Sequence, residues 1–203
     1  MTPQRIADID WRDRLRATVD MCAPTARRFA TPTDVPGVWS VPVTGADNSV
    51  IDAIDVNLVE RLVWVAKPSR KHLVYAQARL PGTKNVAIMV LMHRLVADAK
   101  RTEHVDHING NPLDNRRCNL RLCTDQQNKA NRGPSRKRAG MYKGVYPVAG
   151  TRWEAKIKAN GKCISLGTFY EPTIAALAYD EAASRLHGKF AKLNFPRQPA
   201  ESI

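Results

Sequence analysis

The stretch "HVDHINGNPLDNRRCNLRLCTDQQNKAN", residues 104–131, joins an Asp-His pair to a run rich in asparagine and glycine. Two explanations account for this composition. A long loop uses Asn and Gly because both tolerate tight turns. Hydrolysis of a phosphodiester uses similar side chains, because a base must deprotonate water and oxygen atoms must hold a hard cation. The spacing of the polar residues decides between the two explanations.

Four residues of this stretch lie at defined intervals. Asp106 precedes His107 at the end of a strand-like run. Asn119 follows His107 by 12 positions, in "CNLRL", and Asn128 follows by another 9, in "DQQN". The residue types and intervals together resemble the HNH nuclease family over residues 93–131, in the asparagine-terminated variant of phage and intron homing endonucleases.

The resemblance implies a ββα-metal (His-Me finger) module and a role for each of the four residues. His107 is the general base. Asp106 and the side-chain oxygen of Asn128 hold one divalent cation, and oxygen ligands favour Mg²⁺ or Mn²⁺ over a soft metal. Asn119 completes the catalytic set by bridging the loop and holding the backbone around His107. The expected products carry 5′-phosphate and 3′-hydroxyl ends.

Other polar residues near this pattern have two open roles each. His93, in "MHRLV", either contacts substrate or packs in the core. Several arginines either contact phosphate or are solvated surface charges; they are Arg94, Arg116, Arg117 and Arg121.

The cysteines indicate neither a disulfide scaffold nor a zinc site. The chain has four cysteines, and this small number is typical of a reducing cytosol. Cys118 and Cys123 lie close together in "CNLRLC", but a structural zinc site needs a second matching pair. We therefore expect both to be small buried side chains.

The segments around the nuclease pattern are assigned by hydrophobic periodicity. Residues 8–22 predict a short amphipathic helix, and residues 23–38 a connector rich in Pro and Thr. A β-rich support layer follows, in which β-branched and aromatic residues predict strands at "VWSVPVT", "LVWVA", "LVYAQARL" and "VAIMVLMHRLV", with turns at "GADN" and "PGTKN". Thr124 as N-cap, with Gln127 three positions later, predicts a short helix.

The charge of the chain favours a polyanion as partner. The chain has 32 Lys and Arg against 19 Asp and Glu, a net charge of +13. The excess is densest at residues 132–141, a linker with four basic and no acidic side chains. Each phosphate neutralised by such charges releases counterions, which favours nucleic acid. We expect the linker side chains Arg136, Lys137 and Arg138 to follow either a groove or the backbone of the DNA.

The C-terminal part predicts a small domain of three strands and one helix. The strands are expected at "YKGVYPV", "RWEAKIKAN" and "KCISLGTFY", and "NG" is a strong hairpin signal. The helix lies in "EPTIAALAYDEAASRLHGK", with Pro172 in its first turn and Gly188 at its C-terminal cap. Helical spacing predicts a buried stripe formed by Ile174, Leu177, Ala178 and Leu186.

Residues 142–196 resemble the Apetala/ethylene-response-factor DNA-binding domain, through the ordered marks "KGV", "RWEAKI", "LGTF", "AALAYDEAA" and "LNFP". The resemblance implies that the sheet lies in the major groove and that DNA is contacted by Lys143, Arg152, Trp153, Lys156 and Lys158. Strand alternation leaves a core role open for Trp153, because it shares the parity of Ile157. Tyr146 stands where the plant family has an arginine, so the target sequence is not transferable.

We therefore predict an α+β protein with a ββα-metal nuclease module, a β-rich N-terminal support, and a three-stranded antiparallel sheet packed on one helix. The predicted organisation is an unassigned extension (1–38), an HNH nuclease domain (39–131), a basic linker (132–141), a DNA-binding domain (142–196) and a tail (197–203). The absence of an apolar signal core or a long apolar run predicts a cytoplasmic protein. The resemblance to phage and intron homing endonucleases implies that it is encoded by a phage or mobile element and acts in a bacterial host cell.

The expected function is site-specific, metal-dependent cleavage of double-stranded DNA, by nicking or by cutting both strands. We expect a monomer without a small-molecule substrate. The alternative is a non-catalytic, sequence-specific DNA-binding regulator that keeps the nuclease fold for docking.

Overall fold

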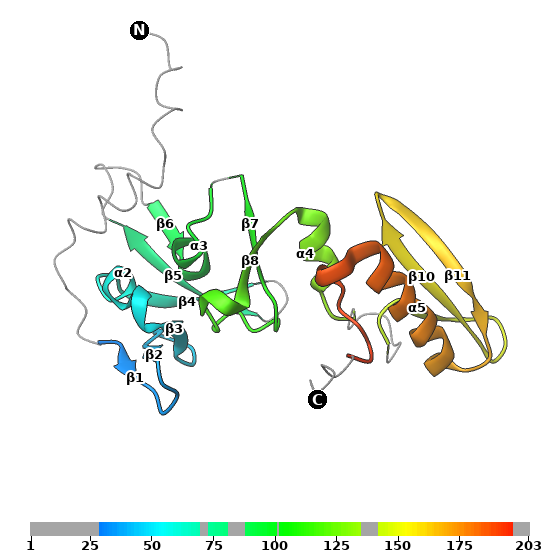
Figure 1. Ribbon diagram of the computed structural model, residues 1–203, viewed down its shortest axis with the longest axis horizontal. Coiled ribbons are helices and arrows are strands. Elements are labelled where there is room, and N and C mark those ends of the chain that lie inside the picture. The colour runs from blue at the N-terminus through cyan, green and yellow to red at the C-terminus, as the bar shows by residue number, and fades with distance from the viewer. Residues whose placement is uncertain (1–28, 70–72, 81–87, 101, 135–141, 197–203) are drawn as a thin grey trace, which may run out of the picture. The chain divides into compact units, whose positions relative to one another are not determined.

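The computed structural model describes residues 29–69, 73–80, 88–100, 102–134 and 142–196 (Figure 1). The chain divides into two compact units, residues 1–122 and 123–203, which are described separately. The helix expected at residues 8–22, the turn "PGTKN" and most of the linker lie outside the described residues. Among the described residues, no helix is long and apolar enough to cross a membrane.

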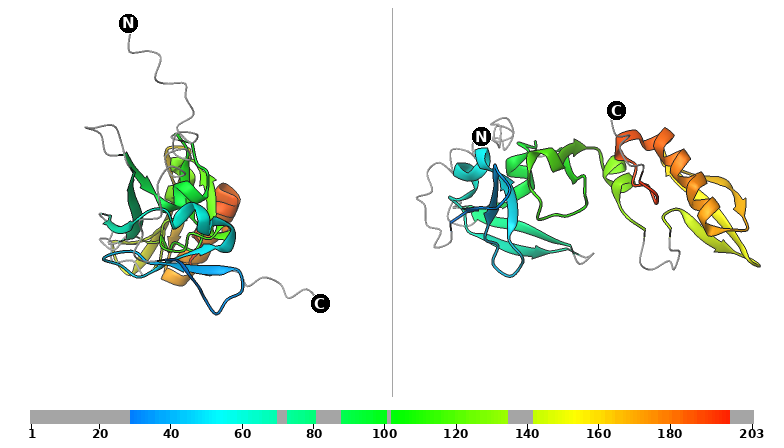
Figure 2. Two further views of the ribbon diagram at one scale, coloured as in Figure 1. Left: turned by 90° about the vertical axis from the view of Figure 1, so that its left-hand side faces the viewer. Right: turned by 60° about the horizontal axis from the view of Figure 1, so that its bottom comes forward.

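Two small antiparallel sheets build most of the first unit (Figure 2). The strands are β1 (Thr31–Pro32), β2 (Val38–Val41) and β3 (Ser49–Asp52) in one sheet, and β4 (Trp64–Pro68), β5 (Val74–Leu80) and β6 (Ile88–Leu91) in the other. The short helices η2 (Ala53–Asp55) and α2 (Val56–Val59) connect them. A parallel bridge between Thr44 and Val65 joins the two sheets. The mixed α/β character with small antiparallel sheets agrees with the expected fold class.

The two sheets share one hydrophobic core. Ile51 of β3, Trp64 of β4 and Leu80 of β5 are almost wholly removed from solvent. The indole Nε1 of Trp64 donates a hydrogen bond of 2.8 Å to the carbonyl oxygen of Val59, which satisfies the polar end of the buried ring. The β-rich segment is therefore a packed layer beneath the residues of the nuclease pattern.

The strand expected to run through "VAIMVLMHRLV" is shorter than predicted. β6 ends at Leu91, and α3 (Met92–Val96) follows immediately. Met92, His93, Leu95 and Val96 are all buried. A short apolar run buried on several sides has no clear periodicity, so strand and helix cannot be distinguished from it.

The nuclease pattern occupies β7 (His104–His107), η3 (Arg117–Asn119), β8 (Leu120–Cys123) and α4 (Asp125–Asn131). The predicted capping box is present, because Thr124 accepts from the Gln127 amide while Gln127 accepts from the Thr124 amide. α4 falls in the second unit, although the sequence assigns it to the nuclease domain; the domain boundary stays a prediction. Cys118 is exposed and Cys123 half-buried, so the expectation of two buried thiols is wrong. The surrounding loop is polar, and it does not enclose them.

The second unit contains the predicted sheet, with β9 (Val145–Val148), β10 (Arg152–Ala159) and β11 (Lys162–Phe169) in the order β11-β10-β9. Asn160 and Gly161 both have positive φ, as the hairpin signal requires. α5 (Pro172–His187) packs on this sheet, and η4 (Gly188–Phe190) follows. Pro172 and Gly188 occupy the two helix ends as predicted.

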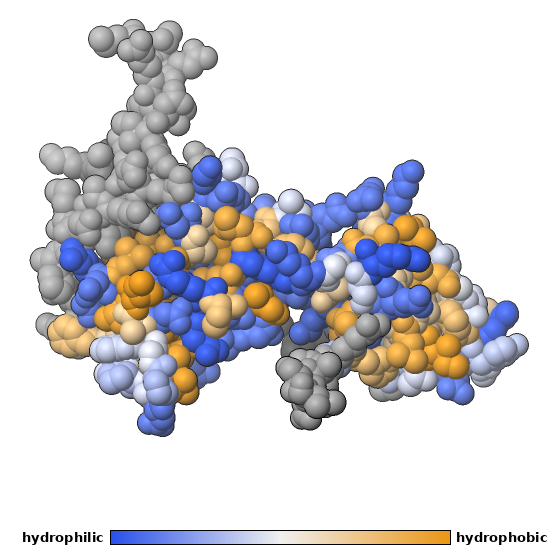
Figure 3. All heavy atoms as spheres, in the orientation of Figure 1, coloured by the Kyte–Doolittle hydropathy of each residue, from blue (hydrophilic) through white to orange (hydrophobic). Residues whose placement is uncertain are grey.

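The buried face of α5 differs from the predicted stripe. Ile174, Leu177 and Leu186 are 47%, 56% and 41% exposed, and Ala178 is half-buried. Figure 3 shows hydrophobic residues gathered on the visible side of this helix. The helix instead turns a different face to the sheet, formed by Ala175, Ala176, Tyr179, Asp180, Ala182 and Ala183. Alanines let the helix approach the sheet closely, so the face with small side chains packs on the sheet in preference to the face with larger aliphatic ones.

Candidate active site

The last two residues of β7 form the centre of the site. Asp106 and His107 are both only 6% exposed. The amide of Ile108, next in the chain, donates a hydrogen bond of 2.9 Å to the carbonyl oxygen of Asn119, which directly precedes β8. The hairpin therefore fixes the backbone on which the Asp-His pair stands.

The His107 ring is enclosed by polar and aromatic neighbours. Its Nε2 lies 3.2 Å from Oδ1 of Asn115. The ring centroids of His93 and Tyr75 lie 5.1 Å and 6.1 Å from the His107 centroid. Burial lowers the pKa of His107 below its usual value, and the hydrogen bond to Asn115 opposes part of this effect. The neutral imidazole is therefore favoured at neutral pH, which is the form that a general base needs.

His93 belongs to the same aromatic cluster. Its side chain is buried, and its ring contacts the His107 ring edge to face. Burial, helped by the nearby His107, lowers the pKa of His93 to about 3. His93 is thus an uncharged packing residue here, while a contact with substrate stays a prediction.

The carboxylate of Asp106 is paired with a cation of the protein itself. Arg121 donates from Nε and Nη2 to Oδ2 of Asp106, at 2.9 Å and 2.7 Å. Both side chains are largely removed from solvent. A divalent ion at Asp106 would therefore share its carboxylate with the Arg121 guanidinium.

The predicted ligands suit a hard cation by chemical type. The Asp106 carboxylate and the Asn128 amide both offer oxygen donors of the kind that Mg²⁺ prefers. Among the described residues, no cluster of three or more His, Cys, Asp or Glu is found. Asn128 lies in the second unit, so its approach to Asp106 stays a prediction.

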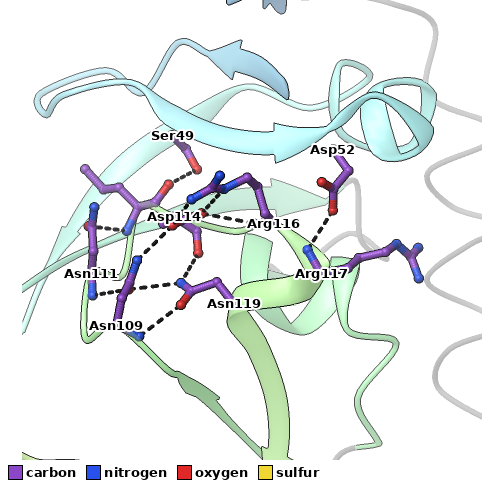
Figure 4. A network of polar contacts seen from close by, with 9 residues as sticks. Ser49, Asp52, Asn109, Asn111, Asp114, Arg116, Arg117 and Asn119 are labelled. Atoms are coloured by element: carbon purple, nitrogen blue, oxygen red, sulfur yellow. Dashed lines mark hydrogen bonds and ion pairs between the residues drawn. The ribbon is translucent and has the colours of Figure 1, made fainter. Parts of the chain in front are cut away.

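Asn119 is at the centre of the network in the loop between β7 and β8 (Figure 4). Its Nδ2 donates to the Asp114 carbonyl oxygen at 2.8 Å and to Oδ1 of Asn109 at 3.0 Å. Its Oδ1 accepts from the Asn109 amide at 2.9 Å. Asn111 continues the pattern by accepting from the Leu113 amide. These contacts hold the loop that returns the chain from His107 to β8.

The arginines proposed as phosphate contacts have internal partners in this unit. Arg94 donates to the carbonyl oxygens of Lys100 and Glu103. Arg116 pairs with Asp114 through two hydrogen bonds of 2.7 Å. Arg117 pairs with Asp55, and its backbone amide donates to Asp52. Their role in binding phosphate stays a prediction, since these contacts primarily hold the loop.

The DNA contacts predicted for the second unit lie in different environments. Arg152 and Lys158 are exposed on β10, and Lys156 forms an ion pair of 2.8 Å with Glu154. Trp153 is half-buried against the core cluster that includes Ala155 and Ala175.

Lys143 differs from these lysines because it is held inside the second unit. Its ammonium donates to the Ala130 carbonyl oxygen, and burial lowers its pKa to about 8. Arg136, Lys137 and Arg138 lie outside the described residues. All of these DNA contacts stay predictions.

Sequence reasoning missed the residues that surround His107. Asn115 lies inside the quoted stretch but was not distinguished from its neighbouring asparagines. Tyr75 and Ser49 come from strands far upstream, and no local pattern relates them to His107. Such contacts follow from tertiary packing.

Comparison with known proteins finds similarity to two kinds of protein. Residues 90–130 match the HNH endonuclease family model, so this part of the chain is similar to that family. An uncharacterized HNH endonuclease of Acanthamoeba polyphaga mimivirus is 27% identical over 137 residues, which cover 68% of this chain and 69% of the viral protein.

A different part of the chain is similar to plant proteins. Dehydration-responsive element-binding protein 2A of Arabidopsis thaliana is 39% identical over 77 residues, 37% of this chain and 23% of the plant protein. An AP2/ERF and B3 domain-containing protein of Oryza sativa subsp. japonica is 42% identical over 64 residues, 32% of this chain and 18% of the rice protein. The chain spans less than a quarter of these two plant relatives, and the resemblance to AP2/ERF domains is confirmed.

Proposed function

We propose that this chain is a site-specific, metal-dependent endonuclease that hydrolyses phosphodiester bonds in double-stranded DNA. The observation that carries the proposal is the buried Asp106–His107 pair at the end of β7, with His107 Nε2 hydrogen-bonded to Asn115. The pair lies within the part of the chain that matches the HNH endonuclease family.

In the proposed reaction, neutral His107 takes a proton from the attacking water. The water oxygen bonds to phosphorus, the P–O3′ bond breaks, and the leaving 3′ oxygen takes up a proton from a solvent water, so that the products carry 5′-phosphate and 3′-hydroxyl ends. Asp106 and Asn128 would hold one Mg²⁺ or Mn²⁺ ion, which when bound would neutralise the charge that develops on the phosphate. Asn119 would keep the loop in the conformation that presents His107.

The second unit would bind the DNA. Its basic strand β10 offers Arg152 and Lys158 to a duplex, and the plant relatives include a protein named dehydration-responsive element-binding protein 2A. Sheet residues that reach base edges in the major groove would give sequence preference, while lysines that contact phosphate would add affinity. A homing or nicking endonuclease acting as a monomer fits this combination.

Cleavage of supercoiled plasmid DNA tests the proposal. The full chain is incubated with Mg²⁺, with Mn²⁺, and with EDTA, alongside the variant Asp106→Ala. Metal-dependent conversion to open-circular or linear DNA, lost in the variant, is the expected result. If the wild type binds the plasmid but cuts it with neither ion, the chain is a non-catalytic DNA-binding regulator.

A further inference from the structure

We propose that Asn115 and Ser49 are positioning residues that hold the His107 ring with its proton on Nε2, leaving Nδ1 as the nitrogen that accepts a proton. The catalytic consequence rests on the proposed nuclease function. The assignment of the His107 tautomer does not rest on that function, because it follows from the hydrogen-bond network alone.

The side-chain amide of Asn115 has its orientation set by acceptors around its nitrogen. Asn115 and Ser49 are both 0% exposed. Nδ2 of Asn115 donates to Oγ of Ser49 at 2.7 Å, and it also lies 3.4 Å from Sδ of Met92 and 3.5 Å from the Pro112 carbonyl oxygen. The thioether and the carbonyl can only accept hydrogen bonds. The amide nitrogen of Asn115 therefore faces these acceptors, and its Oδ1 faces His107.

Ser49 strengthens this assignment because its single hydroxyl proton has another acceptor. Its Oγ donates to the Leu113 carbonyl oxygen at 2.8 Å, and Sδ of Met92, at 3.2 Å, is a weaker acceptor. The Ser49 oxygen must then accept from Asn115. Rotating the amide by 180° would place its oxygen against the Met92 thioether and the Pro112 carbonyl oxygen, neither of which can donate a hydrogen bond to it.

The proton position on His107 follows from this orientation. Oδ1 of Asn115 can only accept, so the neighbouring Nε2 must donate in their hydrogen bond of 3.2 Å. In a neutral imidazole the other nitrogen, Nδ1, then carries the lone pair that accepts a proton. Tyr75 and His93 pack beside the ring, and they restrict its rotation.

The backbone ties this network to the N-terminal sheet. The Val50 amide donates to the Leu113 carbonyl oxygen at 2.9 Å, and the Asn115 amide donates to the Val50 carbonyl oxygen at 2.8 Å. The loop thus pairs with β3 through a parallel bridge between Val50 and Asp114. The β-rich layer therefore does more than support the nuclease pattern, since it supplies Ser49 to the side chain that orients the base.

Two measurements on the full chain test the proposal. Long-range ¹H–¹⁵N spectra report which ring nitrogen of His107 carries the proton, and steady-state cleavage at varied DNA concentration separates kcat from KM. The variants are Asn115→Ala, which removes the acceptor, Asn115→Asp, which keeps an acceptor oxygen, and Ser49→Ala. Asn48→Ala is the matched control, because Asn48 is an exposed neighbour of Ser49 that contacts Ser40.

The wild type should show the Nε2–H tautomer. Asn115→Ala should give a mixture of tautomers and lower kcat roughly 10–100-fold with little change in KM, the range typical of residues that orient catalytic groups. Asn115→Asp should restore the tautomer and part of kcat, Ser49→Ala should show a smaller loss, and the control should match the wild type.

An Nδ1–H tautomer in the wild type, or unchanged tautomer and kcat in Asn115→Ala, would overturn the proposal. If Asn115→Ala fails to fold, the tautomer in Ser49→Ala decides, because that variant keeps the Asn115 side chain. If the wild type cleaves no DNA, the nuclease function fails, while the spectra still decide the positioning of His107.

Discussion

At the scale of single residues, burial of His93 ties stability to pH. Its pKa is about 3 in the folded chain, against 6.5 as its ordinary value, so the unfolded chain binds a proton first as pH falls. Stability contributed by neutral His93 is complete above pH 6.5 and decreases down to about pH 3. Each pH unit in this window corresponds to roughly 1.4 kcal/mol.

We therefore expect the first unit to lose about 2 kcal/mol of unfolding free energy between pH 7 and pH 5 through this residue. Urea denaturation at both pH values measures the loss. His93→Phe should reduce it, and replacement of the exposed His104 by Phe serves as the control. An equally large loss in His93→Phe would show that His93 is not its source.

Gly144 of the "KGV" mark is required by a close approach in the second unit. Its φ is +78°, and an added Cβ would lie 1.9 Å from Cδ2 of Tyr179 and 2.8 Å from the carbonyl oxygen of Lys156. Gly150 has nearly the same φ, +79°, but open space around it. Substitutions at these two glycines therefore distinguish the cost of steric overlap from the cost of backbone strain.

Gly144→Ala should destabilise the second unit by roughly 3 kcal/mol, because overpacking adds to the cost of positive φ. Gly150→Ala should cost about 1 kcal/mol, since only the backbone conformation is unfavourable. Thermal unfolding of both variants gives the comparison. Equal losses would contradict the close packing of Tyr179 on Gly144.

At the scale of elements, α5 holds the C-terminal "LNFP" segment through one carboxylate. Asp180 accepts hydrogen bonds of 2.8 Å from the amides of Asn194 and Phe195, and one of 3.0 Å from Nδ2 of Asn194. The Asn194 side chain in turn binds the backbone of Lys143: its Oδ1 accepts from the Lys143 amide, and its Nδ2 donates to the Lys143 carbonyl oxygen. The segment is thereby held against the residues that precede β9.

Asp180→Ala should cost about 3 kcal/mol, because it leaves several buried donors without an acceptor. Glu181→Ala, at the exposed neighbouring position, should change stability by less than about 0.5 kcal/mol. Hydrogen exchange should show faster exchange at the amides of Asn194 and Phe195 in the first variant. Unchanged exchange there would mean that the segment is held by other contacts.

The elements also show how far sequence reasoning reaches. The hairpin at Asn160–Gly161, the capping box at Thr124 and the two ends of α5 were predictable, because local backbone chemistry determines them. The face of α5 was not predictable, because alanines and larger aliphatic residues both satisfy helical spacing and the sheet selects between them. The Ser49–Asn115 contact joins positions 66 residues apart, and only the folded packing of β3 against the loop creates it.

At the scale of the whole molecule, binding and cleavage should be separable. Removing Arg152 and Lys158 together should weaken DNA binding and reduce the slope of log affinity against log salt by roughly 2, because each phosphate contact contributes about one unit. The cleavage rate at saturating DNA should stay unchanged. Arg185→Ala with Lys189→Ala removes the same charge from exposed positions on α5 and η4. An equal loss of affinity in this control would indicate attraction by net charge instead of contacts from the sheet.

The most direct test is the cleavage rate of His107→Ala, measured at DNA concentrations where binding assays show both proteins saturated. We expect the variant to bind DNA like the wild type in Mg²⁺ but to cleave at least about 100-fold more slowly, since general-base catalysis contributes roughly that much. Cleavage at the wild-type rate by the DNA-saturated variant would contradict the assignment of His107 as the base.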